Sequence, residues 1–150
     1  MTENVTIASV PIPTVVQQAT AEFLGTAFLV AAVVGSGITA ETLSPGDVGL
    51  QPLENSIVTG AALVALILAL QPVSASFNPV VTVVQRVLGR VTTRDATALV
   101  LAQLAGGVTG AVVANVMFGL DAVSASTHHR ASGPHLLGEV VATPGRRQAP

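Results

Sequence analysis

The chain has 150 residues, of which half are hydrophobic and only 9% are charged, and its mean hydropathy is +0.69. A soluble domain usually carries about 25% charged residues, so this composition favours a membrane protein. The net charge of −2 argues against nucleic-acid binding, and the absence of cysteine excludes disulfides and thiolate metal sites.

Long apolar runs follow a short N-terminal tail, residues 1–13. They are expected as spans at Val15–Ile38, at Ser56–Leu70 with Asn55 and Gln71 as extensions, and at Ala96–Leu120. No Lys or Arg precedes the first run, which argues against a secretory signal peptide. Residues 39–53 contain two prolines and two glycines and therefore predict a loop.

A shorter segment that begins with Asn78 and Pro79 lies between the second and third runs. Asn is a favoured helix N-cap and Pro a favoured first helical residue, so a helix is predicted from here to about Leu88. Its length of roughly 16 Å is half of a bilayer core, which indicates a re-entrant half-helix whose N-terminus faces a cavity. The alternative is an ordinary short helix in a soluble core, and the composition of the whole chain disfavours it.

The arginines predict the orientation of the chain. Arg86, Arg90 and Arg94 cluster around the turn that ends the half-helix, whereas the 39–55 segment holds three acidic residues and no basic one. The positive-inside rule places the arginines in the cytoplasm. We therefore expect a multi-pass protein of the cell membrane with a cytoplasmic N-terminus, the 39–55 segment outside and Asn78 near the midplane of the lipid bilayer.

Small residues recur every four positions in two of the runs. They are Ala102, Gly106, Gly110 and Ala114 in the third run, and Ala61, Ala65 and Ala69 in the second. Such rows allow helix backbones to approach closely in lipid, so both rows predict helix packing. The alternative is that small residues are simply frequent in this chain.

Glu22 is an acid in an apolar run, where a carboxylate normally faces the bundle interior and has a partner. We expect it beside the backbone of residues 73–77. Its surroundings, AEFLGT, are echoed by GEVVAT around Glu139, and three predicted crossings separate the two copies. This is the pattern of an inverted-topology repeat, with chance similarity over six residues as the competing explanation.

In their order, these motifs resemble the first half of a major intrinsic protein, the family of aquaporins and aquaglyceroporins. The resemblance covers about residues 20–143 and is carried by AEFLGT, SASFNPVVT, LAQLAGGVTGAVVAN and HLLGEVVAT. It implies a fold of six spans and two half-helices that meet at mid-membrane. It also implies passive transport of water or of small neutral solutes such as glycerol or metalloids, with no enzymatic activity and no cofactor.

The resemblance assigns roles to individual residues. Asn78 would donate hydrogen bonds to the solute, and Pro79 would open the half-helix, with Val80 in place of the usual Ala. Thr59 matches a position of the selectivity constriction, where a side chain smaller than the Phe of water-selective members implies a wider filter. Residues in supporting positions would be Glu22 and Glu139, which brace the pore loops, and Gln103, which faces the bundle.

The expected fold is thus an all-α membrane protein: an aquaporin-like half-unit with three transmembrane helices, one re-entrant half-helix and the stub of a fourth span, over residues 14–143. Pro144, Arg146 and Arg147 then end the fourth apolar run, which leaves residues 144–150 as a tail.

We expect an incomplete channel that needs a further copy or a complementary half-channel. The alternative is a non-conducting membrane remnant or interaction protein. His128, His129 and His135 lack acidic companions, so no metal site is expected.

Overall fold

The computed structural model describes residues 12–123, which form four helices. These are α1 (Val15–Leu43), α2 (Leu50–Leu70), α3 (Pro79–Val87) and α4 (Thr93–Met117). α1, α2 and α4 are long and apolar enough to cross a membrane, and α3 is short, so the predicted fold class is confirmed. The expected stub of a fourth span, with Glu139, lies outside the described residues.

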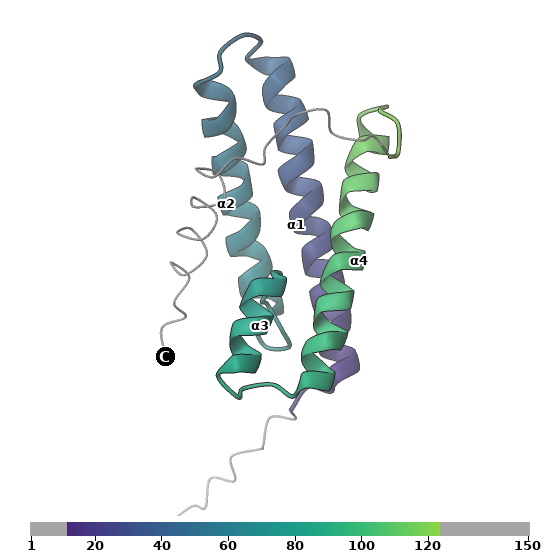
Figure 1. Cartoon of the computed structure of the whole chain (residues 1–150). Helices are drawn as coiled ribbons and strands as arrows, with labels where there is room; N and C mark the ends of the chain where they lie inside the picture. Colours follow the sequence, from purple (N-terminus) through teal and green to yellow (C-terminus); the bar gives the residue numbers. More distant parts are fainter. Residues whose placement is uncertain (1–11, 124–150) are drawn as a thin grey trace, which may run out of the picture.

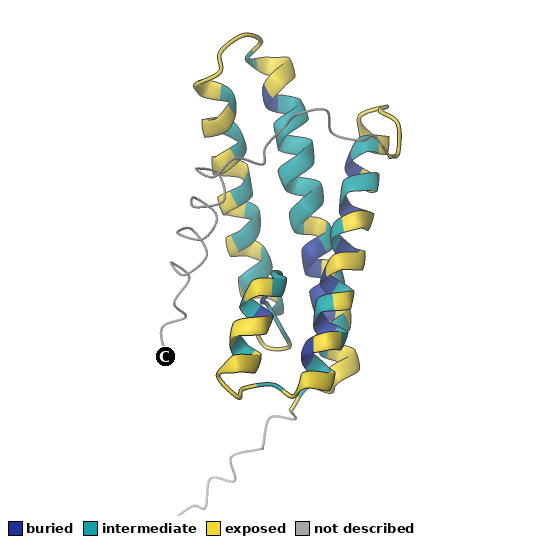
Figure 2. Cartoon of the chain, viewed as in Figure 1, coloured by how far each residue is buried: buried dark blue, intermediate teal, exposed yellow. Residues whose placement is uncertain are grey.

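α1 is the helix against which both other long helices pack, and α3 packs on α4. Figure 1 shows α3 at the end of the bundle where α4 begins and α2 ends. The half-helix therefore occupies only one end of the space beside the long helices. Figure 2 shows that the buried residues gather where α1 and α4 meet, near α3.

The connection between α1 and α2 is shorter than the loop predicted at 39–53. α1 continues to Leu43 and α2 already begins at Leu50. Pro52 lies in the first turn of α2, where the backbone N–H that proline lacks would have no helical partner. Gly46, with a φ of 81°, lies in the intervening turn. Pro52, which the sequence predicts to lie in the loop, is therefore part of the helix start.

The ends of α4 also differ from the predicted run, 96–120. The helix begins at Thr93 because Thr92 caps it: the Thr92 hydroxyl accepts a hydrogen bond of 3.1 Å from the backbone N–H of Asp95. It ends at Met117, and Gly119 follows in the left-handed region with a φ of 69°. Both ends are therefore set by capping chemistry rather than by the limits of the apolar run.

The predicted close packing of the third run is confirmed. A Cβ atom on Gly106 would lie 2.3 Å from the carbonyl oxygen of Phe23, and one on Gly110 would lie 2.2 Å from that of Ala27. These contacts are with backbone atoms of α1, which cannot rotate away. α1 and α4 can approach this closely only because α4 has glycine at both positions.

The matching prediction for the second run is wrong within the described residues. Ala61, Ala65 and Ala69 are all exposed. The half-buried positions of α2 include Asn55, Thr59, Ala62 and Leu66, and Asn55 accepts a hydrogen bond of 2.8 Å from Ser36 of α1. Successive residues are turned by about 100° around a helix, so the alanine row lies off the face that contacts α1.

Candidate functional site

Asn78 is the N-cap of α3, and this cap engages the oxygen but not the nitrogen of its side-chain amide. Its backbone is extended, with φ −149° and ψ 121°, and its Oδ1 accepts a hydrogen bond of 2.8 Å from the backbone N–H of Val80. Pro79 is the first helical residue and Thr82 N donates to the Asn78 carbonyl at 3.1 Å. Since the amide oxygen serves as the cap, the amide NH₂ of Asn78 is the group that can donate to a solute.

Phe77, just before the cap, turns the chain into the half-helix. Its φ of 48° lies in the left-handed region, which costs a non-glycine residue roughly 1–2 kcal/mol. The ring packs over Gly25 of α1, where a Cβ atom would lie 2.0 Å from Phe77 Cε1. Phe77 is buried, so its ring anchors the strained turn in a hollow that only glycine provides.

The carboxylate of Glu22 holds the same turn from the side of α1. Ser76 N donates to Glu22 Oε1 at 2.8 Å and Phe77 N to Oε2 at 2.7 Å. The Ser74 hydroxyl also donates to Oε1, and Gln103 Nε2 donates to Oε2 at 2.8 Å. Glu22 is 0% exposed. Four donors on two oxygens use the acceptor capacity of an ionised carboxylate, so the buried charge is compensated by hydrogen bonds.

Gln103 joins this group to α3. Its Nε2 also donates to Thr82 Oγ1 at 2.9 Å, and both residues are almost fully buried, at 1% and 0% exposure. Gln85 Nε2 donates to Ser76 Oγ at 3.2 Å, which connects α3 back to the irregular segment. The Glu22 cluster, defined here as Glu22, Ser74, Ser76, Phe77, Thr82, Gln85 and Gln103, thus ties α3 directly to α4, and to α1 through Gln103 and the segment that precedes α3.

The sequence predicts two members of the Glu22 cluster, Glu22 and Gln103, as supporting residues and places Glu22 beside residues 73–77. It does not predict the individual roles of Ser74, Ser76, Phe77, Thr82 and Gln85. Thr82 and Gln85 do carry a signal, because they are polar residues in a short helix of mostly apolar residues, four and seven positions after Asn78. At that spacing they share a face with the cap. A polar face on an otherwise apolar membrane helix could have identified them.

The other predicted site residues lie apart from this cluster. Thr59 is half-buried on α2, and its hydroxyl donates to Asn55 Oδ1 at 3.1 Å, so it belongs to a separate polar group with Ser36. Val80 is 49% exposed, and its backbone N–H donates to the Asn78 cap. Among the residues from 12 to 123, no group of three or more His, Cys, Asp or Glu could hold a metal ion.

A cavity of about 670 Å³ lies at the opposite end of the bundle from α3. Its lining is mostly apolar and comes from the later half of α1, the start of α2 and the end of α4. Glu54 is the acidic residue in its wall. Glu54 Oε1 accepts a hydrogen bond of 2.9 Å from Ser44, whereas Oε2 is buried without a partner in the described part of the chain.

Comparison with known proteins gives one consistent result. The sequence model of the family "Major intrinsic protein" matches residues 9–143. The chain is 47% identical to "Aquaglyceroporin AqpS" of Rhizobium meliloti (strain 1021) over 126 residues, which are 83% of this chain and 54% of that protein. It is 39% identical to "Aquaporin A" of Dictyostelium discoideum over 91 residues, 60% of this chain and 32% of that protein. The chain therefore spans about half the length, or less, of these relatives. No solved structure matches it.

Proposed function

Since this chain belongs to the major intrinsic protein family, we propose that it forms one half of a channel for water or small neutral solutes, with the start of α3 lining the pore. As a member of this family it is a multi-pass membrane protein of channel type and not an enzyme. The observation that carries the proposal is the hydrogen bonding of the Asn78 side-chain amide. Its amide oxygen is occupied by Val80 N, so its NH₂ group can face a passing solute.

The chemistry of the half-helix suits neutral solutes. The NH₂ group of Asn78 replaces a hydrogen bond that water or a hydroxyl solute gives up on leaving bulk solvent. The N-terminus of α3 also carries the positive end of the helix dipole, which disfavours cations at that point. In this proposal the Glu22 cluster supports the pore by keeping Asn78 in place, since it holds the turn directly before it.

The second half of the pore would come from a complementary half-unit, either another polypeptide or a further copy of this chain. The resemblance to the family calls for a second half-helix that approaches from the other side. The 670 Å³ cavity lies at the end that α3 leaves free, and its mostly apolar walls suit an apolar helix. Oε2 of Glu54, which has no hydrogen-bond partner among residues 12–123, could accept a hydrogen bond from that helix.

Thr59 is the proposed filter residue on this half. Its side chain is small, and its hydroxyl is held by Asn55, so it would leave space at a constriction. The relative from Rhizobium meliloti bears the name of an aquaglyceroporin. We therefore propose that the solutes include molecules of glycerol size as well as water.

Flux measurements on reconstituted vesicles test this function. The chain would be incorporated alone and together with the second half of AqpS, and water and glycerol permeability would be followed by light scattering. We expect flux above that of empty vesicles only when both halves are present, because the described residues supply a single half-helix. Flux from the chain alone would instead assign the second half of the pore to a further copy of this chain.

Two variants make this test specific. Asn78→Asp keeps the capping oxygen and removes the NH₂ group, so it should abolish flux without unfolding α3. Asn115→Asp makes the same chemical change near the end of α4 and should conduct as the wild type does. Flux that does not depend on Asn78 would contradict the assigned pore. Absence of flux with both halves present would favour an interaction protein that does not conduct.

A further inference from the structure

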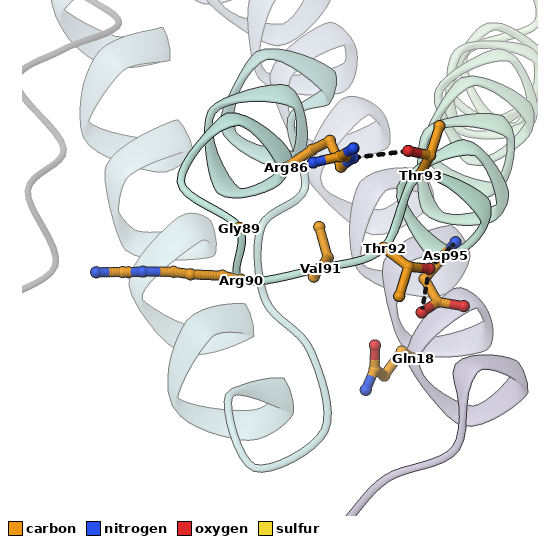
Figure 3. Close-up of a pocket in the computed structure, with 8 residues that line it drawn as sticks. All are labelled: Gln18, Arg86, Gly89, Arg90, Val91, Thr92, Thr93 and Asp95. Atoms are coloured by element: carbon orange, nitrogen blue, oxygen red, sulfur yellow. Dashed lines mark hydrogen bonds between the residues drawn. The ribbon is translucent and has the colours of Figure 1, made fainter.

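A second cavity, of about 550 Å³, lies where α3 ends and where α1 and α4 begin. Its wall is formed by Gln18 of α1, Arg86 of α3, the turn at residues 89–92, and Thr93 and Asp95 of α4 (Figure 3). This arginine pocket is separate from the Glu22 cluster, with which it shares no residue. It brings polar groups from three helices to one end of the bundle.

Arg86 is the residue in the arginine pocket with the most defined geometry. Its Nε donates a hydrogen bond of 2.8 Å to Thr93 Oγ1, so its guanidinium is directed across the gap from α3 to α4 (Figure 3). This bond uses Nε and leaves the terminal Nη1 and Nη2 groups as a planar fork. Such a fork matches the oxygens of a phosphate group and can bind two of them at once.

Asp95, the acidic residue of the lining, is engaged in the cap of α4. Its carboxylate accepts a hydrogen bond of 2.8 Å from the Thr92 hydroxyl, and its backbone N–H donates to the same hydroxyl at 3.1 Å. Arg86 and Asp95 therefore each bind a neighbouring threonine. The Arg90 side chain extends away from the pocket in Figure 3, so Arg86 is the cationic side chain that faces the pocket.

The position of the pocket along the bundle indicates the kind of anion. α1 and α4 have membrane length, and the pocket lies at their first turns. This is the level at which the apolar core of a bilayer gives way to the headgroups, where lipid phosphates lie. Basic pockets between membrane helices are suited to anionic headgroups. We propose that the arginine pocket binds the phosphate of an anionic membrane lipid, with Arg86 as its main ligand.

Lipid binding can be measured on the purified chain in neutral detergent. Native mass spectrometry would count bound phosphatidylglycerol, and circular dichroism would follow thermal unfolding, since the chain has no Trp or Tyr for fluorescence. We expect phosphatidylglycerol to bind and to raise the unfolding temperature. Phosphatidylcholine and inorganic phosphate should do neither at the same concentration. An equal effect of inorganic phosphate would overturn the assignment to a lipid.

Variants distinguish a specific binding site from a general attraction of anionic lipids to positive charge. Arg86→Gln should weaken phosphatidylglycerol binding about fivefold, the scale of one basic residue at an anionic surface. Arg94→Gln removes the same charge from an exposed residue in the first turn of α4 that does not line the pocket, and it should have a much smaller effect. Equal losses in the two variants would overturn the proposal.

Thr93→Val provides a second test that leaves the net charge unchanged. It removes the hydroxyl that holds Arg86 Nε, so the guanidinium loses its orientation. Binding of phosphatidylglycerol should weaken in this variant while the helical circular dichroism signal stays the same. Full retention of binding in both Thr93→Val and Arg86→Gln would show that Arg86 does not form the site.

Discussion

The amide of Gln103 and the carboxylate of Glu22 are 81 positions apart in the chain, and a hydrogen bond of 2.8 Å joins them in the core. The bond connects α4 to α1, and the same amide nitrogen reaches Thr82 of α3 at 2.9 Å. The position of Asn78 relative to α1 and α4 thus depends on side chains that lie away from its own cap. The first prediction follows from this dependence.

Glu22→Gln should destabilise the protein although it preserves the shape of the side chain. The variant replaces one of two acceptor oxygens with an NH₂ group that faces buried donors. We expect the free energy of unfolding to fall by about 1–3 kcal/mol, the usual cost of leaving a buried donor unsatisfied. Unfolding in mixed micelles, followed by circular dichroism, measures this. Glu41→Gln, at the exposed end of the same helix, is the matched control and should be neutral.

Gly110→Ala should separate α1 from α4. The new Cβ atom would meet the carbonyl oxygen of Ala27 at 2.2 Å, and a backbone atom cannot move aside without shifting the helix. We expect a loss of roughly 1–3 kcal/mol, as for other overpacked cores. Gly60→Ala is the control, because nothing lies within 4 Å of the Cβ position there. Equal stabilities of the two variants would show that the contact between α1 and α4 is not tight.

Asn78→Ala should loosen the first turn of α3, because it removes the oxygen that accepts from Val80 N. The loss of an N-cap costs about 0.5–2 kcal/mol. Asn78→Asp retains an acceptor and should keep this turn intact. Hydrogen exchange at the amides of residues 80–82 distinguishes the two variants. Similar exchange rates in both would mean that the cap does not stabilise the helix.

The orientation predicted from the arginines can be tested with single cysteines, since the chain contains none of its own. Val48 lies between α1 and α2 and is 82% exposed. A reagent that cannot cross the membrane should label Val48→Cys in intact cells, and it should label Arg90→Cys only after lysis. The reverse pattern would place the N-terminus outside and contradict the positive-inside assignment.

Much of the fold could be predicted because its signals are local. Hydropathy locates the long helices, and Asn78 with Pro79 marks the start of α3 through capping preferences that need no tertiary context. The contact of Glu22 with the backbone near residues 76 and 77 could be expected because a carboxylate in an apolar helix requires donors.

The remaining features depend on which surfaces meet, and this is not encoded by spacing alone. The small residues of α2 (Ala61, Ala65 and Ala69) recur with the same period as Gly106 and Gly110 of α4. In the described structure only the two glycines lie against α1. The partnership of Thr82 with Gln103 also arises only when α3 and α4 are side by side. The roles of Thr59 in the filter and of Glu139 in a second half-unit stay predictions.

The spread of Glu22's partners along the chain has a consequence for biosynthesis. Ser76 and Gln103 follow Glu22 by 54 and 81 residues, so both leave the ribosome well after α1. At a translation rate of about 5–20 residues per second, Gln103 emerges roughly 4–16 s after Glu22. Because a carboxylate without partners is costly in lipid, α1 should remain shielded by the insertion machinery during this interval. Photo-crosslinking from position 22 in nascent chains of increasing length should therefore show release into lipid only once Gln103 has been made.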